Sequence, residues 1–81
     1  PLKLFSAVAS QSHLVADYRP GDILVFGKES VGLPPALLAE HPTYALPTIG
    51  GVRSLNLANA VAVVAYEAMR QLGAFDEVSL A

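Results

Sequence analysis

The sequence predicts an α/β fold in which helices flank a parallel sheet. Short aliphatic segments alternate along the 81 residues with stretches whose apolar residues recur at helical spacing. Glycine or proline separates most of these segments, as expected where the chain turns. The resulting order of strand, helix, strand, helix, strand and helix is typical of a layered α/β domain with parallel strands.

The first half of the chain is predicted to hold two strands joined by a short helical turn. Leu2 to Ala9 alternates and then becomes continuously apolar, which is typical of a buried strand in a parallel sheet. His13 to Tyr18 is predicted to form a turn or two of helix that stops before Pro20, because the residue preceding a proline disfavours helical geometry. Asp22 to Gly27 is aliphatic and bounded by glycine, and it gives the clearest strand prediction.

The second half is predicted to hold a short helix, a brief strand and a long helix. Ala36 to Glu40 follows a Pro-Pro pair, and proline is tolerated in the first turn of a helix because its missing N–H costs nothing there. Tyr44 to Pro47 is predicted to be a strand at a sheet edge or strand end, since Pro47 cannot donate to a ladder. A helix from about Leu55 to Leu72 is predicted to end at Gly73.

The long helix shows more than one distinct face. The stripe expected to pack on the sheet consists of Leu57, Val61, Val64, Ala68 and Leu72. Another stripe contains Asn59, Val63, Glu67 and Arg70, in which Glu67 and Arg70 are spaced for an ion pair. Small side chains occupy the remaining sides, at Ala58, Ala60, Ala62 and Ala65. Because small side chains let another helix approach closely, we expect a homodimer through this C-terminal helix.

Composition places the chain among small, apolar single domains. It is 53% hydrophobic and 15% charged, with a mean hydropathy of +0.47, so some apolar surface is expected to meet a partner. The longest apolar run, Ala60 to Tyr66, is far shorter than a membrane span of about 18 residues. No secretory pattern opens the chain, and we expect a cytoplasmic protein with no membrane partner. With no cysteine, the chain has neither disulfides nor a thiolate zinc site.

The charge balance argues against a free-standing nucleic-acid binder. The net charge is −2 and the isoelectric point is about 5.5, whereas phosphate binding usually requires clustered basic residues. The basic residues are scattered along the chain, as Lys3, Arg19, Lys28, Arg53 and Arg70. If the protein acts on RNA, most phosphate contacts are therefore expected from chain beyond these residues or from a second subunit.

Two motifs carry the functional signal. The glycine pair Gly50-Gly51 and Arg53 lead directly into the helix start Ser54-Leu55-Asn56-Leu57-Ala58-Asn59. A glycine-containing loop at a helix start presents free backbone N–H groups, which suits a small polar or anionic ligand. Upstream, the segment Phe26-Gly27-Lys28-Glu29-Ser30-Val31-Gly32-Leu33-Pro34 follows the strand that begins at Asp22. Both glycine-rich loops follow predicted strands.

The two motifs, in this order, resemble the paired C-terminal motifs of the SPOUT class of RNA methyltransferases, which have an α/β trefoil knot and use S-adenosylmethionine. The Leu-Asn-Leu-x-Asn-Ala-Val helix start followed by Tyr66-Glu67 looks most like the tRNA 2′-O-methyltransferases that modify cytidine or uridine 34. The resemblance covers residues from about Leu4 to Phe75. It implies methyl transfer from S-adenosyl-L-methionine to a ribose 2′-hydroxyl, with tRNA as the partner; whether cytidine or uridine, tRNA or rRNA, is modified stays open.

The resemblance also implies which residues form the site. Those expected to bind the cofactor are Val8, Gly27, Glu29, Gly32, Leu46, Ser54, Leu55 and Asn59. Those expected to bind substrate are Arg53, Ser54 and Asn56. Residues 1–81 would form the C-terminal portion of one SPOUT domain, because the chain opens on Pro1 without an initiating methionine. The N-terminal half, which supplies the catalytic arginine in the family, would lie outside this chain, and this portion alone is expected to be inactive.

Each assignment has a simpler structural alternative. A lone Gly27 fits an ordinary strand-ending turn, Ser54 fits a helix N-cap, and Glu29 or Arg53 fits a solvated surface charge. For the whole chain, the alternative is a noncatalytic α/β dimerisation or regulatory module with the same fold. His13 and His41 have no carboxylate or second histidine at ligand spacing, so no metal site is expected, and no hydrolase or nucleotide-binding motif is present.

Overall fold

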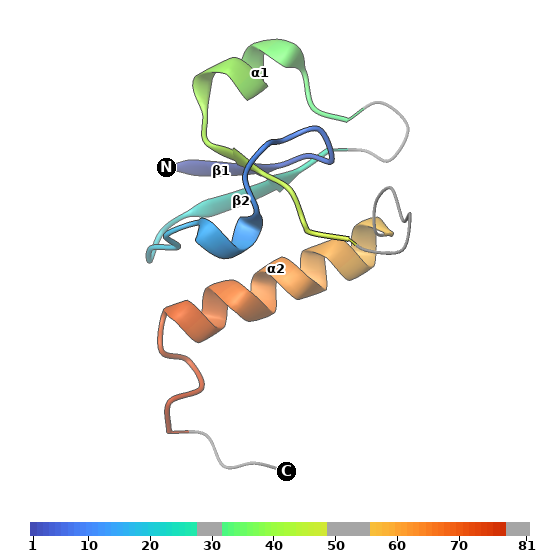
Figure 1. Cartoon of the computed structure of the whole chain (residues 1–81). Coiled ribbons are helices and arrows are strands. Elements are labelled where there is room, and N and C mark those ends of the chain that lie inside the picture. The colour runs from blue at the N-terminus through green and yellow to red at the C-terminus, as the bar shows by residue number, and fades with distance from the viewer. Residues whose placement is uncertain (28–31, 49–55, 78–81) are drawn as a thin grey trace.

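The computed structural model describes residues 1–27, 32–48 and 56–77 of the chain. Within these residues the elements are β1 (Leu2–Phe5), the 3₁₀ helix η1 (His13–Val15), β2 (Ile23–Phe26), α1 (Pro35–Glu40), β3 (Thr43–Tyr44) and α2 (Leu57–Gln71). The three strands form a parallel sheet in the order β2-β1-β3. Figure 1 shows α1 on one side of this sheet and α2 on the other. The predicted α/β fold with a parallel sheet is confirmed.

The main core lies between the sheet and α2. Phe5, at the end of the central strand, stacks on Phe26 of β2 with ring centroids 4.7 Å apart, and its ring also lies near those of Tyr18 and Tyr44. Val64 of α2 is fully buried against this cluster. Successive side chains of a strand point to opposite faces, so Leu4, which is also fully buried, belongs to the face opposite Phe5.

The amino ends of β1 and β2 are joined by a buried ion pair. The ammonium group of Lys3 donates a hydrogen bond to the carboxylate of Asp22, and both side chains are largely buried. The same carboxylate accepts from the backbone N–H of Arg19 at 2.9 Å. The hydrogen bond from Lys3 is the main cause that lowers the pKa of Asp22. Lys3, one of the five basic residues of the sequence, is therefore paired with a carboxylate inside the fold.

The bounds of the first and third strands differ from the sequence-based prediction. The first strand ends at Phe5 rather than continuing to Ala9, because Ser6 turns the chain: its carbonyl accepts from Ala9 N–H and its hydroxyl from Val8 N–H. The strand predicted from Tyr44 to Pro47 is instead Thr43–Tyr44, extended by a single bridge between Ala45 and Ser12. Its predicted edge position is correct.

The long helix also begins and packs differently from the prediction. Its N-cap is Asn56, whose side-chain oxygen accepts from Ala58 and Asn59 N–H at 2.9 and 3.3 Å, so the helix starts at Leu57. Its predicted end is confirmed: Gly73 has φ +80° and donates to Arg70, while Ala74 donates to Met69, the hydrogen bonds of a Schellman motif. The predicted sheet-facing stripe is only partly right, because Val64 and Ala68 are buried whereas Val61 and Leu72 are 40% and 46% exposed.

Candidate functional site

The carboxyl ends of the three strands meet at one edge of the sheet. Phe5 pairs in register with Phe26 on one side and with Tyr44 on the other. The residue that follows each strand therefore lies in one row, and neighbouring strands are about 4.8 Å apart. Figure 1 shows the N-terminal end of α2 on the same side of the molecule as these strand ends. In open α/β sheets, ligands bind outside the carboxyl ends of the strands, so this edge is the candidate site.

Gly27 occupies the β2 end of this row, and its lack of a side chain is required. A Cβ atom there would lie 2.6 Å from the carbonyl carbon of Gly32 and 2.8 Å from the backbone nitrogen of Leu33. Gly32 itself has φ +68°, a conformation that favours glycine. The structure thus brings together Gly27 and Gly32, two predicted cofactor residues, as a close backbone-to-backbone contact. Glu29, predicted to hold the same loop, lies outside the described residues.

Val8 and Leu46 follow the ends of β1 and β3 along the chain. Val8 belongs to the turn after β1 and is 82% exposed, so its side chain is available to a ligand. Leu46 follows β3 by two residues and packs, partly buried, against the aromatic core. Leu46 therefore has a packing role that does not depend on any ligand. It is also the kind of anchored apolar side chain that can wall an adenine ring.

The polar residues predicted at the start of the long helix divide into two groups. Asn56 and Asn59 are both exposed, and the side-chain oxygen of Asn56 is engaged as the helix cap. The cap that the sequence offered to Ser54 is thus made by Asn56. The positions of the Asn56 amide nitrogen and of the Asn59 side chain do not by themselves indicate which ligand they would bind. Arg53, Ser54 and Leu55 lie outside the described residues.

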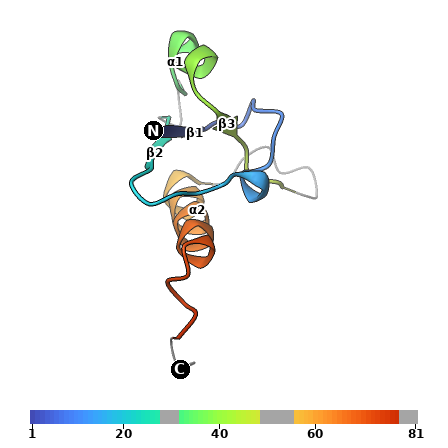
Figure 2. The same ribbon diagram turned by 90° about the vertical axis from the view of Figure 1, so that its left-hand side faces the viewer.

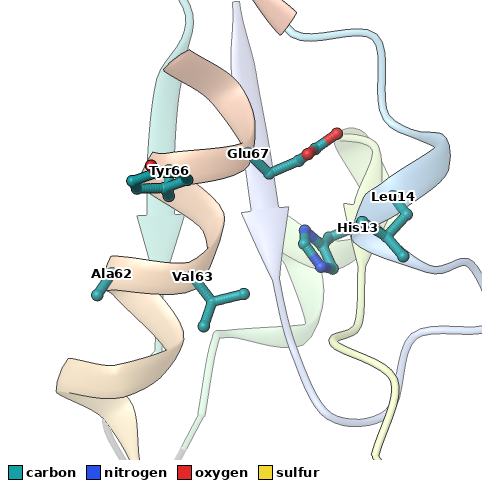
Figure 3. A pocket seen from close by; sticks show the side chains of 6 residues that line it. All are labelled: His13, Leu14, Ala62, Val63, Tyr66 and Glu67. Carbon is teal, nitrogen blue, oxygen red and sulfur yellow. The ribbon is translucent and has the colours of Figure 1, made fainter. Parts of the chain in front are cut away.

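A second concave surface lies between η1 and α2 and was not predicted. It is an open groove of about 450 Å³ lined by His13, Leu14, Ala62, Val63, Tyr66 and Glu67. Figure 3 shows these side chains arising from two elements, with His13 and Leu14 facing residues of α2. No local signal could find this groove, because it exists only once α2 has docked beside η1. The prediction that His13 lies in a turn gave no indication that it would lie near Glu67, which is 54 residues further along the chain.

The groove contains two titratable groups in unusual surroundings. His13 is 3% exposed and its Nδ1 atom has no hydrogen-bond partner among the described residues. Burial lowers the pKa of His13, and the negative charge of Glu67 opposes this shift in part. The Glu67 carboxylate accepts two hydrogen bonds from Arg70 and one from Gln71, each 2.9 Å, which lower its pKa to about 2. The ion pair of Glu67 with Arg70 was predicted and is confirmed.

The described residues lack two further features. They contain no cluster of three or more histidine or carboxylate side chains that could hold a metal ion. In the same parts of the chain, every helix is too short or too polar to cross a membrane.

Comparison with known proteins gives consistent matches. The profile of the SpoU rRNA Methylase family matches residues 2–66. The tRNA (cytidine(34)-2′-O)-methyltransferase of Escherichia coli K12 is 42% identical over 78 residues, which cover 90% of this chain and 50% of that protein. The chain therefore spans about half the length of the curated relatives it matches.

Solved structures agree with the sequence matches. A protein whose structure was determined for insights into the 2-OH methylation of C/U34 on tRNA superposes with a TM-score of 0.84 at 53% identity, covering 90% of this chain and 48% of that one. The TrmH/SpoU tRNA modifying enzyme of A. aeolicus superposes with a TM-score of 0.76 at 26% identity, covering 99% and 43%. The fold is therefore that of the C/U34 and TrmH/SpoU proteins over nearly the whole chain.

Proposed function

The chain belongs to the SpoU rRNA Methylase family, and from this premise we propose that it forms part of an S-adenosylmethionine-dependent tRNA 2′-O-methyltransferase that acts at anticodon position 34. The observation that carries the proposal is its likeness, over most of its length, to tRNA (cytidine(34)-2′-O)-methyltransferases. The row of strand ends beside Gly27 and Leu46 supports it, because that is where an α/β sheet binds ligands. We expect the protein to be located in the cytoplasm.

The proposal assigns residues 1–81 to the C-terminal, cofactor-binding portion of one SPOUT domain that closes into a trefoil knot. An N-terminal portion, with the arginine expected to be catalytic, would complete it. This assignment rests on the coverage, since the matched relatives are about twice as long as the matched segment. The segment alone would then hold cofactor residues without the residues that complete catalysis.

The described residues fit a methyl donor of this kind. When bound, S-adenosylmethionine supplies a sulfonium-linked methyl group for in-line transfer to an oxygen nucleophile. Such a ligand needs backbone groups at close range and an apolar wall for its adenine. Gly27 packs its main chain against that of Gly32, which is exposed and carries no side chain, and Leu46 provides an anchored apolar surface. Val8 and Asn59 lie exposed at the end of β1 and the start of α2, where each can contact such a ligand.

The charges of these residues suggest that RNA is bound mainly by parts of the protein outside residues 1–81 or by a second subunit. Three of the five basic side chains are already paired with carboxylates: Lys3 with Asp22, Arg19 with Asp17, and Arg70 with Glu67. The buried Lys3 is unavailable to a phosphate, and the exposed Arg19 and Arg70 must first leave a carboxylate partner before they can bind one. Arg53 stays the proposed phosphate ligand of this segment, beside Ser54 and Asn56. The N-terminal portion or a second subunit would supply the remaining positive charge.

We also propose that the protein is a homodimer through α2. The support is a set of large apolar side chains of that helix that are 40 to 65% exposed: Val61, Val63, Tyr66 and Met69. The Tyr66 ring lies against Phe75, with centroids 4.6 Å apart, which holds an apolar patch in place on the helix surface. A Tyr66→Asp substitution should shift the full-length protein toward monomer in sedimentation velocity, whereas Tyr66→Phe should not. Equal dimer fractions in both variants would rule out this surface.

The methyl-transfer proposal is tested with the full-length protein, radiolabelled S-adenosylmethionine and tRNA transcripts. We expect label on a transcript with a 2′-hydroxyl at position 34 and none on a matched transcript whose nucleotide 34 is 2′-deoxy. Label that persists on the 2′-deoxy transcript would refute position 34. If the protein labels neither transcript and fails to bind S-adenosylhomocysteine, the noncatalytic module becomes the correct interpretation.

A further inference from the structure

We propose that Gln71 is a positioning residue for the cofactor pocket, acting through Tyr18 and η1 on the backbone that carries Leu46. The inference rests on the proposed function, because it assigns Leu46 to the pocket wall. It adds a residue at the far end of α2, which neither motif in the sequence contains. A chain of hydrogen bonds joins α2 to the segment that follows β3.

The side-chain amide of Gln71 is held at both ends. Its oxygen accepts from the backbone N–H of Tyr18 at 3.1 Å, and its nitrogen donates to the carboxylate of Glu67 at 2.9 Å. A carboxylate only accepts, so Glu67 selects the nitrogen of the amide and turns the oxygen toward Tyr18. Arg70 fixes Glu67 in turn through two hydrogen bonds. Gln71 thus joins the last turn of α2 to the segment between η1 and β2.

Tyr18 passes this constraint to η1. Its ring is 4% exposed, and its hydroxyl donates to the carbonyl of His13 at 3.2 Å. Burial, aided by the negative charge of Glu67, raises the pKa of Tyr18 to about 12, so the hydroxyl keeps its proton at neutral pH. Gln71 and the hydroxyl hold Tyr18 at its two ends, one at the backbone and one at the ring tip. The position of η1 therefore depends on where α2 holds Tyr18.

The last link connects η1 to the candidate site. His13 N–H donates to the carbonyl of Ala45 at 2.8 Å, and Ala45 N–H donates to the carbonyl of Gln11 at 2.7 Å. Ala45 is thereby bonded to the residues on both sides of Ser12, which is the N-cap of η1. Ala45 also directly precedes Leu46. A shift of η1 must move Ala45, and with it the wall that Leu46 forms. Figure 2 shows η1 in blue beside the end of β3, with α2 below.

The test compares Gln71→Met with Arg70→Met in the full-length protein. Methionine fills similar space but leaves Tyr18 N–H without its acceptor, whereas Arg70→Met leaves the Gln71 to Tyr18 bond in place. Calorimetry should show that Gln71→Met weakens S-adenosylhomocysteine binding about tenfold, because η1 and Leu46 are then no longer held in the binding geometry, and Arg70→Met about twofold at most. A purely structural role would lower the melting temperature of Gln71→Met and leave the affinity of the folded protein unchanged, which would overturn the proposal.

A second measurement uses the unaltered protein and so does not depend on how the variants fold. Coupling between two sites is reciprocal, so cofactor binding must strengthen the Gln71 to Tyr18 bond. Saturating S-adenosylhomocysteine should slow exchange of the Tyr18 amide hydrogen more than that of Asp22, which bonds within its own turn to Arg19. Equal slowing at Tyr18 and Asp22 would refute the role of Gln71. Failure of the unaltered protein to bind S-adenosylhomocysteine would instead refute the proposed function itself.

Discussion

Replacing Gly27 by alanine tests whether the close contact at the end of β2 serves ligand binding. The new Cβ would lie 2.6 Å from the carbonyl carbon of Gly32, where ordinary contact begins at 3.4 Å. The main chain must therefore move by about 0.8 Å, because the neighbours are backbone atoms that have no rotamer to change. Overpacking of this kind costs about 1–3 kcal/mol. We expect the free energy of unfolding of the full-length protein to fall by that amount.

Gly21→Ala provides the control for this prediction. Gly21 has φ +89°, so alanine is strained there, yet a Cβ would meet nothing within 4 Å. The left-handed conformation costs about 1–2 kcal/mol, which makes the two variants similar in stability. Urea unfolding measures that cost, and calorimetry with S-adenosylhomocysteine measures affinity. Gly27→Ala should lose affinity by about tenfold or more, equivalent to 1.4 kcal/mol, while Gly21→Ala keeps it. Unchanged affinity in Gly27→Ala would refute the reasoning.

Three further predictions concern the core, the groove and the helix start. Val64→Ala should lower the free energy of unfolding by about 2–3 kcal/mol, because it removes fully buried methyl groups and leaves a cavity. Val61 is half-exposed, so Val61→Ala should lower it by less than half as much. Equal losses would contradict the observed packing. Because burial lowers the pKa of His13 below its ordinary value of 6.5, the unfolded chain takes up the proton more readily, so stability is lost as the pH falls through 6.5 and below. Urea unfolding of His13→Leu should show a smaller loss over that range, and parallel curves would exclude His13 as the source. Asn56→Asp keeps the capping oxygen and should retain the melting temperature, while Asn56→Ala should lower the free energy of unfolding by about 1 kcal/mol. Reduced tRNA binding by Asn56→Asp in a filter assay would support a role of Asn56 in substrate binding, and full binding would exclude that role.

The parts of the fold that follow from local chemistry were predictable from the sequence. Ile23–Phe26 is a strand because its side chains are aliphatic or aromatic and its neighbours are turn residues, and Gly73 ends α2 because it readily takes a positive φ. Pro47, which cannot donate to a neighbouring strand, predicted an edge position or a strand end for the third strand, and β3 lies at the edge of the described sheet. In each case a single residue type decides the outcome.

The errors arose where a choice depends on competing partners. Ser54 and Asn56 are both good N-caps, and periodicity alone does not show which of them the helix uses. Ser6 ends β1 early through hydrogen bonds to its own turn, although the apolar pattern continues to Ala9. Val61 was placed in the buried stripe because helical spacing identifies a face without giving the width that the sheet covers.

The candidate site divides along the same line. Gly27 and Gly32 were identified from a motif. Only the structure shows why position 27 requires glycine: a Cβ there would lie 2.6 Å from the backbone of Gly32. The charge interaction of Glu67 with His13 and the hydrogen bond from Tyr18 to Gln71 join residues far apart in the sequence. Interactions of that kind depend on how α2 docks against the crossover between β1 and β2, and no local pattern encodes them.

The most direct test of the account is a crystal structure of the full-length protein with S-adenosylhomocysteine. The account predicts that the ligand lies at the carboxyl ends of the strands, in contact with backbone of Gly27 and with the side chain of Leu46. A ligand seated instead in the groove between His13 and Glu67, or one that touches neither Gly27 nor Leu46, would contradict it.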